Sequence, residues 1–293
     1  MEIIERPEHL EPFRGCALVA TMGALHEGHA SLIRAAQASG VPVVVSVFVN
    51  PTQFGPTEDL ARYPRTLDKD FKLAMRSGAR ALFAPSVEAI YPSGVYAASA
   101  EAAALQLPRV ATEPQLEEAF RPTHFAGVCQ VVARLFDLCE PSLALFGEKD
   151  FQQLRVISEL VEQHPARWPG LTVAAAPTVR EADGLAMSSR NRYLDPPQRA
   201  LALAIFAALS EVARAPLRRD DIPDAEARMQ QILSENALKT QYAVIRDAHS
   251  LTPVSAKTRH GRALIAASLG HVRLIDNVSI SLGAHDSYID KLF

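Results

Sequence analysis

The stretch that decides the fold of this 293-residue chain spans residues 17–50 and reads ALVATMGALHEGHASLIRAAQASGVPVVVSVFVN. A short apolar run at its start is followed by a turn with two glycines, and then by residues 30–39, which place Leu32, Ile33 and Ala36 on one face of a helix. Residues 41–49 are almost continuously apolar and β-branched, which is typical of a strand buried on both faces of a parallel sheet. The stretch therefore predicts one β–α–β unit.

The same alternation continues toward residue 176. Further candidates for buried strands lie at residues 81–84, 143–146 and 171–176, and helical stretches at residues 67–77 and 127–139 separate them. Strands that alternate with helices predict a Rossmann-like, doubly wound parallel sheet, because each crossover lays its helix on a face of the sheet. The fold class is therefore α/β.

The pattern changes after Pro177, where a polar segment begins. It is followed by two helical stretches and three short strand candidates, at residues 199–213, 224–236, 242–246, 263–269 and 272–275. A chain of this length exceeds the usual size of one domain. We predict a larger α/β domain over residues 1–178 and a smaller α+β domain over residues 179–293.

Composition excludes several classes of protein. The formal net charge of −3 gives no basic surplus to hold a nucleic-acid backbone, and no apolar run reaches the ~18 residues of a membrane span. Three cysteines without a CxxC pair fit reduced thiols better than a disulfide framework, and the acidic N-terminal residues do not resemble a secretion signal. We expect a cytoplasmic protein with small-molecule partners, and neither nucleic acid nor a membrane among them.

The turn between the first strand and the first helix, residues 21–29, carries the strongest chemical signal. Ligands of open α/β sheets bind beyond the carboxyl ends of strands, and the N–H groups at a helix start favour anions. Gly23 and Gly28 let the backbone approach a ligand, while His26 and His29 are placed to donate hydrogen bonds to a phosphate. A chance pair of histidines, or half of a metal site, is the alternative.

Two more strand ends carry polar groups. Asn50 and Gln53 follow the second strand, where the alternative is a proline-initiated turn capped by asparagine. Lys149, Asp150 and Gln153 follow the strand at residues 143–146; lysine suits a phosphate and aspartate suits ribose hydroxyls. A helix capped by Asp150 is the alternative there.

The segment AMSSRN, residues 186–191, lies at the expected domain junction. Two hydroxyls followed by an arginine suit a mobile clamp on nucleotide phosphates, and a plain surface turn is the alternative. Because all these segments place phosphate-compatible groups at the strand ends of one sheet or at the junction, their convergence favours a functional site.

With these motifs the chain resembles the pantothenate synthetases, the pantoate–β-alanine ligases of the nucleotidyltransferase superfamily that also holds class I aminoacyl-tRNA synthetases. The resemblance is carried in chain order by TMGALHEGH, SVFVNPTQF, EDLARYPRTLDKD, FAPSVEAIYP, RPTHFAGV, FGEKDFQQL, PTVREADGLAMSSRNRYL and RLIDN. It implies a homodimeric enzyme that uses ATP with Mg²⁺ to join pantoate to β-alanine through a pantoyl adenylate. The metal would be held mainly through the ATP phosphates, so no protein ligand to it is assigned.

The resemblance also implies roles for individual residues, with His29 as the expected general acid. The implied catalytic set is His29, His26, Lys149, Ser188, Ser189 and Arg190. The implied ATP contacts are Met22, Gly23, Ala24, Leu25, His26, Glu27, Gly28, His29, Gly147, Glu148, Lys149, Asp150, Val179, Met187, Ser188, Ser189 and Arg190. The implied contacts to pantoate and β-alanine are Gln53, Gln153, Asn50 and Tyr63.

Three positions depart from the pattern of that family. Ala20 stands where proline is usual before the turn, Glu118 stands where glycine is usual in LEEAF, and Ala126 stands where arginine is frequent. The first two lie near the expected site and bear on the geometry of its loops.

Two other functions remain open. One is another enzyme of the superfamily, such as a cytidylyltransferase or a ligase related to tRNA synthetases; the balanced charge and the absence of an anticodon-type domain argue against the latter. The other is a nucleotide-binding regulator without turnover, which the presence of His29, Lys149 and Ser189 argues against.

Overall fold

The computed structural model describes residues 1–55 and 60–283. Contacts between Cα atoms divide the chain into two compact units. The N-terminal unit comprises residues 1–179 and 187–189, and the C-terminal unit comprises residues 180–186 together with the chain from residue 190.

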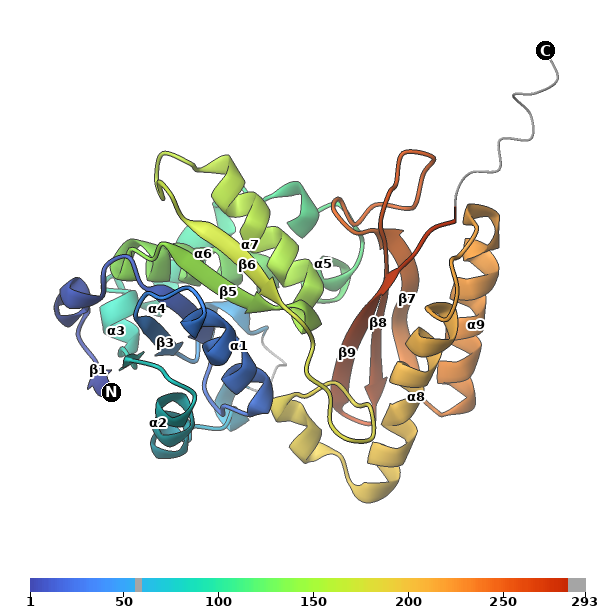
Figure 1. The fold of residues 1–293 in the computed structure, drawn as a ribbon, viewed down its shortest axis with the longest axis horizontal. Coiled ribbons are helices and arrows are strands. Elements are labelled where there is room, and N and C mark those ends of the chain that lie inside the picture. The colour runs from blue at the N-terminus through green and yellow to red at the C-terminus, as the bar shows by residue number, and fades with distance from the viewer. Residues whose placement is uncertain (56–59, 284–293) are drawn as a thin grey trace, which may run out of the picture. The chain divides into compact units, whose positions relative to one another are not determined.

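A six-stranded parallel sheet forms the centre of the N-terminal unit, with the strand order β1-β4-β3-β2-β5-β6 (Figure 1). Its strands are β1 (Glu2–Ile4), β2 (Ala17–Thr21), β3 (Val43–Val47), β4 (Ala81–Phe83), β5 (Leu143–Gly147) and β6 (Thr172–Ala176). The chain moves outward from β2 through β3 to β4, and then returns to add β5 on the other side of β2. The carboxyl ends of β2 and β5 therefore flank the topological switch point, where open α/β sheets bind ligands.

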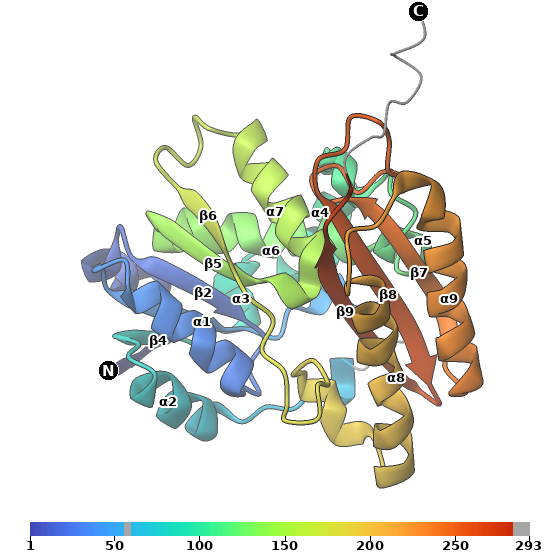
Figure 2. The same cartoon turned by 45° about the vertical axis from the view of Figure 1, so that its right-hand side comes forward.

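Helices cover both faces of this sheet (Figure 2). On one face, α1 (Glu27–Gln37) and α2 (Leu67–Arg76) bury Ile33 and Ala74 against Val19 and Val45. On the other, α6 (His124–Cys139) and α7 (Phe151–Gln163) pack on each other, as right-handed crossovers on opposite sides of β2 require. Each fully buried valine or isoleucine contributes about 1.5–3 kcal/mol. The short helices of this unit are α3 (Val87–Ile90), α4 (Gly94–Ala103) and α5 (Glu117–Phe120).

The C-terminal unit packs two helices on a three-stranded antiparallel sheet of order β7-β8-β9. Its elements are α8 (Pro196–Val212), α9 (Ile222–Glu235), β7 (Lys239–Asp247), β8 (Gly261–Leu269) and β9 (Val272–Ile280). Ile205 and Leu209 of α8, Met229 of α9 and Ile265 of β8 are almost fully buried in its core. The fold class predicted from the sequence, a doubly wound α/β sheet with a smaller α+β part, is confirmed.

Several element bounds differ from those the sequence predicts. Strand β9 continues to Ile280 and does not end at residue 275, because the buried polar pair Asp276 and Asn277 interrupts its apolar pattern without interrupting the strand. Helix α1 begins at Glu27, three residues before the predicted start at residue 30, because the two histidines cap it. Strand β3 is confined to Val43–Val47.

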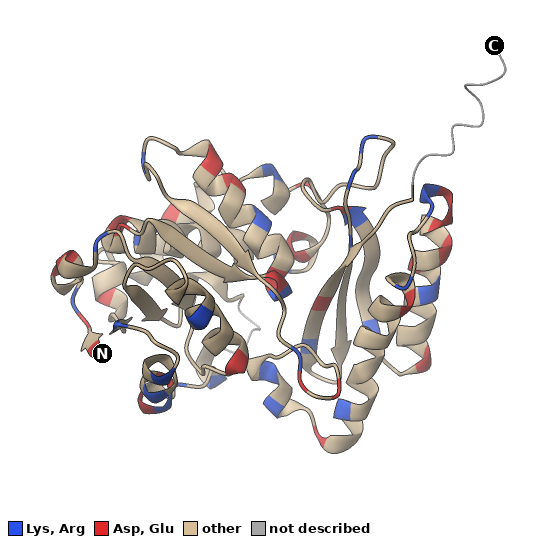
Figure 3. Ribbon diagram, in the orientation of Figure 1, with Lys and Arg blue, Asp and Glu red and all other residues tan. Residues whose placement is uncertain are grey.

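Charged residues of both signs are interspersed along the helices (Figure 3). This distribution matches the balanced formal charge of the whole sequence. Among the helices of the described residues, none combines the length and apolar character needed to cross a bilayer.

Candidate active site

The turn after β2 is built on a left-handed backbone. Gly23 and Ala24 have φ angles of 85° and 52°, a region that a residue with a side chain seldom adopts. The Thr21 hydroxyl donates to the Ser46 carbonyl oxygen at 2.7 Å and accepts from the Gly23 N–H at 3.1 Å. A Cβ on Gly23 would lie 3.0 Å from Val47 Cγ1, so the turn also runs close against β3.

Helix α1 begins with a capping box made of two histidines. His26 Nδ1 accepts a hydrogen bond from the Gly28 N–H, and His29 Nδ1 accepts one from the His26 N–H, both at 3.2 Å. A backbone N–H can only donate, so each Nδ1 presents its lone pair and each neutral ring carries its proton on Nε2. The ring centroids are 4.1 Å apart. The pair therefore holds two Nε2–H donors side by side at the switch point.

The electrostatics of His29 favour its neutral form. Burial lowers the pKa of His29 to about 3, and electrostatic interactions with His26 and Lys149 act in the same direction. At pH 7 the ring is therefore a neutral hydrogen-bond donor. This environment favours stabilisation of negative charge by His29 over proton donation, and the general-acid role implied by the resemblance stays a prediction.

Five backbone N–H groups of this turn are bonded within the protein. Those of Ala24 and Leu25 donate to the buried carboxylate of Asp70, at 3.0 and 2.8 Å, and those of Gly23, His26 and Gly28 donate to side chains of the turn itself. For these five residues the N–H groups are engaged within the protein, and the expectation that N–H groups at this helix start meet an anion stays a prediction for the others. The imidazole Nε2–H groups are the donors that the turn organises.

The turn after β3 is held by Asn50, only 1% exposed. Its Nδ2 donates to Gln53 Oε1 at 3.2 Å and to the Gly127 carbonyl at 3.1 Å, while its Oδ1 accepts from the Tyr91 hydroxyl at 2.8 Å and from the Thr52 N–H at 3.3 Å. The alternative interpretation of a turn capped by Asn50 is thus what the structure shows. Both amide hydrogens of Asn50 are used in holding Gln53 and α6 together.

Gln53 links this turn to residues 21–29, which carry His26 and His29 and are called the histidine turn below. Its Nε2 donates to Met22 Sδ at 2.8 Å, and its carbonyl oxygen lies 3.1 Å from His124 Nδ1. Tyr63 is buried, with its ring 5.9 Å from that of Phe54 between centroids. The residues predicted to contact the substrates therefore include a pair, Met22 and Gln53, brought together from two adjacent strand ends.

The third strand end follows β5. Gly147 leads into a 3₁₀ turn, Glu148–Asp150, and then into α7. Lys149 Nζ lies 3.6 Å from Asp150 Oδ1, and the Asp150 side chain makes no capping hydrogen bond to α7, so the alternative of a helix capped by Asp150 is not found. Gln153 lies in the first turn of α7 and is half-buried. The charge of Lys149 also contributes to the lowered pKa of His29, after burial and His26.

The segment that follows β6 returns to this strand edge. The Met187 N–H donates to the Val179 carbonyl at 3.0 Å, and a Cβ placed on Gly28 would lie 3.8 Å from Met187 Cβ. Ser188 and Ser189 belong with Met187 to the N-terminal unit, whereas Arg190 belongs to the C-terminal unit. The structure thus brings Met187 to the start of α1.

The loop before this segment is fixed within the C-terminal unit. The Arg180 guanidinium donates to both carboxylate oxygens of Asp276, at 2.5 and 3.0 Å, and to the Gly184 carbonyl at 3.1 Å. Its Cζ lies 4.2 Å from the centroid of the Phe206 ring. Asp276, from the RLIDN motif, therefore anchors the loop that leads to Met187.

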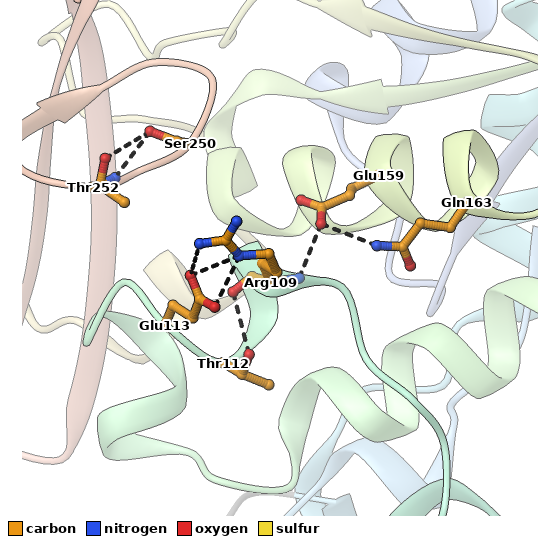
Figure 4. Close-up of polar contacts among 7 residues, drawn as sticks. All are labelled: Arg109, Thr112, Glu113, Glu159, Gln163, Ser250 and Thr252. Carbon is orange, nitrogen blue, oxygen red and sulfur yellow. Dashed lines mark hydrogen bonds and ion pairs between the residues drawn. The ribbon is translucent and has the colours of Figure 1, made fainter.

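The departure at residue 118 has a structural explanation. Glu118 Oε1 accepts from the Gln115 N–H at 2.6 Å, and Oε2 accepts from Nε2 of the buried Gln152 at 2.7 Å. A second tie lies nearby, where the Arg109 N–H donates to Glu159 Oε1 at 3.0 Å (Figure 4). The carboxylate that replaces the usual glycine thus fastens the segment to α7.

A parallel sheet with a left-handed glycine turn, paired imidazole donors and a lysine at its switch point defines an α/β enzyme of the nucleotide-binding class. The family model described as pantoate-beta-alanine ligase matches residues 4–279, and this chain belongs to that family.

Relatives and solved structures agree with this assignment. The chain is 45% identical over 269 residues to pantothenate synthetase of Pseudomonas fluorescens, covering 90% of each chain, and 45% identical over 276 residues to that of Nocardia farcinica, covering 92% of this chain and 81% of the relative. The crystal structure of pantothenate synthetase from Thermus thermophilus matches with a TM-score of 0.84 and 36% identity over 96% of this chain and all of that one.

A pantoate-beta-alanine ligase from Francisella tularensis, complexed with beta-gamma ATP and β-alanine, matches with a TM-score of 0.74 and 30% identity over 95% of this chain and 97% of that chain. The predicted family and the prediction of an amide-forming ligase are confirmed.

Proposed function

We propose that this protein condenses pantoate with β-alanine at the expense of ATP, through a pantoyl adenylate, and releases pyrophosphate and then AMP. The observation that carries the proposal is the meeting of polar groups after β3, β2 and β5, which are neighbours in the sheet. The direct contact of Met22 with Gln53 and the influence of Lys149 on His29 support it.

In the first step a pantoate carboxylate oxygen attacks the α-phosphorus of ATP. The bond between that phosphorus and the oxygen that bridges the α- and β-phosphates breaks, and pyrophosphate leaves. Negative charge accumulates on the departing pyrophosphate, so fixed donors lower the barrier. We assign this role to the Nε2–H groups of His26 and His29 and to the ammonium of Lys149.

The remaining nucleotide contacts complete this assignment. We assign Ser188, Ser189 and Arg190 to the triphosphate, as a clamp. The other ATP contacts of the proposal are Met22, Gly23, Ala24, Leu25, Glu27, Gly28, Gly147, Glu148, Asp150, Val179 and Met187. Because Gly23, Ala24 and Leu25 have engaged N–H groups, we propose that they act on ATP by shaping the turn.

In the second step the β-alanine amine attacks the acyl carbon of the adenylate and AMP leaves. We propose that Gln53, Gln153 and Tyr63 bind pantoate, with Gln53 also close to β-alanine. Asn50, whose amide hydrogens hold Gln53 and the Gly127 carbonyl, acts as a positioning residue for Gln53.

Mg²⁺ is part of the proposal through ATP itself. No cluster of three or more His, Cys, Asp or Glu side chains suited to a metal ion occurs within residues 1–55 and 60–283. The cation would therefore take its ligands from the phosphates and neutralise their charge when bound.

The proposal extends to the organisation of the molecule. We propose that residues 1–178 bind ATP and pantoate, that residues 179–293 close over them, and that the enzyme works in the cytoplasm as a homodimer. Three free cysteines, Cys16, Cys129 and Cys139, support a reducing compartment. Light scattering of the purified protein tests the dimer.

One experiment tests the reaction. Pyrophosphate release is measured with ATP and pantoate alone, and AMP release is measured after β-alanine is added. We expect pyrophosphate to depend on pantoate and AMP to depend on β-alanine. If pyrophosphate release did not depend on pantoate but depended on another carboxylic acid, the substrate assignment would be overturned.

A pair of variants tests the role of His29 in this assay. We expect His29→Ala to slow pyrophosphate release by a few hundredfold, or about 3 kcal/mol, the cost of losing one charge-stabilising donor. His271→Ala, at an exposed histidine of the turn between β8 and β9, is the control. Adenylate formation at the wild-type rate in His29→Ala would remove His29 from the mechanism.

A further inference from the structure

The histidine turn is hydrogen-bonded to a buried carboxylate that belongs to another element, helix α2. Asp70, in the first turn of α2, is 1% exposed. Its Oδ2 accepts from the Ala24 N–H at 3.0 Å, and its Oδ1 accepts from the Leu25 N–H at 2.8 Å, across 45 residues of sequence. The Thr66 hydroxyl completes the set, donating to Oδ1 at 3.1 Å.

The turn and the carboxylate depend on each other. Ala24 is held in the left-handed region, with φ of 52°, although its Cβ makes that conformation sterically strained. Two charge-assisted hydrogen bonds from consecutive N–H groups hold the turn in that conformation. In return, the turn supplies two of the three donors described above, without which the buried Asp70 carboxylate would keep only the Thr66 hydroxyl.

We propose that Asp70 is a positioning residue of the reaction, which fixes the left-handed turn so that the two imidazole Nε2–H groups face the departing pyrophosphate. This inference rests on the proposed function. Leu25, whose N–H binds Asp70, immediately precedes His26, so a shift of the turn reaches the capping box within one residue. Asp70 itself acts on the chemistry only through this turn.

The test compares Asp70→Asn with two control variants in the pyrophosphate assay. The amide keeps the shape but replaces one acceptor with an NH₂ donor, which faces a backbone N–H and cannot bond it. We expect kcat for adenylate formation to fall by about ten- to a hundredfold, the effect of a misplacement near 1 Å. Asp68→Asn and Lys69→Gln each remove an exposed charge of the same helix, so both should retain kcat within about twofold.

Two further readouts separate positioning from general stability. Histidine ¹⁵N shifts should report protonated Nε2 and unprotonated Nδ1 at His26 and His29 in the wild type, and an altered pattern in Asp70→Asn. Ala24→Gly removes the cost of the left-handed conformation, so the double variant Ala24→Gly with Asp70→Asn should regain part of the lost kcat.

The outcomes are distinct. Wild-type kcat and an unchanged histidine pattern in Asp70→Asn, with an active parent enzyme, would overturn the positioning role alone. Loss of pantoate dependence in the parent enzyme would overturn the proposed function instead. If Asp70→Asn does not fold, Asp70→Glu, which keeps the charge and moves the carboxylate by one methylene, is measured in its place, and wild-type kcat there would likewise overturn the role.

Discussion

Replacing Gly127 by alanine should separate the stability of this enzyme from its activity. Gly127 lies in α6 where the turn Pro51–Gln53 packs directly on the helix. A Cβ at this position would lie 2.4 Å from the Thr52 carbonyl oxygen, 2.5 Å from the Thr52 carbonyl carbon and 2.6 Å from Gln53 Cα. All three are backbone atoms, so no side-chain rotation relieves the contact. Ordinary contact begins near 3.4 Å, and the turn must therefore move by about 1 Å.

Two effects on stability oppose each other in Gly127→Ala. Forcing extra volume into a packed site costs about 1–3 kcal/mol, while alanine stabilises a helix interior over glycine by about 0.5–1 kcal/mol. The net loss of unfolding free energy is then about 0–2.5 kcal/mol. The effect on activity is larger, because Gln53 moves with the turn and a misplacement of about 1 Å costs about 100-fold in rate.

The assay pairs urea unfolding with pantoate-dependent pyrophosphate release. We expect Gly127→Ala to stay folded at 25 °C while kcat/KM for pantoate falls by about two orders of magnitude. Ala133→Gly, in the same helix, is the matched control, since it alters helix propensity without touching the turn and should lose stability but not activity. A Gly127→Ala enzyme with wild-type kcat/KM would refute the reasoning that the turn positions Gln53.

Three further predictions follow from single contacts. The pKa of His29 is lowered from 6.5 to about 3 in the folded protein, so between these values only the unfolded chain takes up the proton. The contribution of neutral His29 to the free energy of unfolding is therefore fully present above pH 6.5 and declines toward pH 3, with a loss of up to about 2 kcal/mol at pH 5. His29→Gln should flatten this pH dependence in urea titrations at pH 7 and pH 5. Asp276→Asn breaks the buried ion pair with Arg180 and should lower the free energy of unfolding by about 3–5 kcal/mol. Asp276→Leu combined with Arg180→Met should recover the stability, measured by calorimetry, but not the activity. Recovery of both stability and activity would show that the pair does not position the loop that leads to Met187. Glu118→Gln should cost about 1 kcal/mol in thermal unfolding through loss of one of its two hydrogen bonds, and an unchanged melting temperature would mean that Glu118 does not fasten its segment.

The central sheet could be predicted from sequence because its strands are apolar on both faces. Residues 41–49 and 143–146 indicate buried strands without reference to anything distant, and β3 and β5 lie there. Strand β1 has only three residues, of which Ile4 alone is buried, so no local pattern marks it. Its pairing with β4 arises from tertiary structure.

The candidate site shows the same division. The histidines and glycines of residues 21–29 and the amides after β3 could be found because their residue types suit phosphate and carboxylate chemistry. Asp70 was missed, because a single aspartate in the first turn of a helix is equally expected for the helix dipole, and its contact with Ala24 spans 46 residues. Asn50 was identified, but only the structure shows that its amide is used internally.

The capping box of His26 and His29 makes one pair of side chains serve both the start of a helix and the proposed chemistry. The two tasks use different atoms, since Nδ1 caps the helix and Nε2 carries the proton that the proposed chemistry uses. A descendant that gave up turnover would be free to keep the first task alone, with serine or aspartate at residue 26 and glutamine at residue 29, and would lose no helix. Under the proposed mechanism, the identities of these two residues would therefore distinguish enzymes that retain turnover from relatives that keep only the fold.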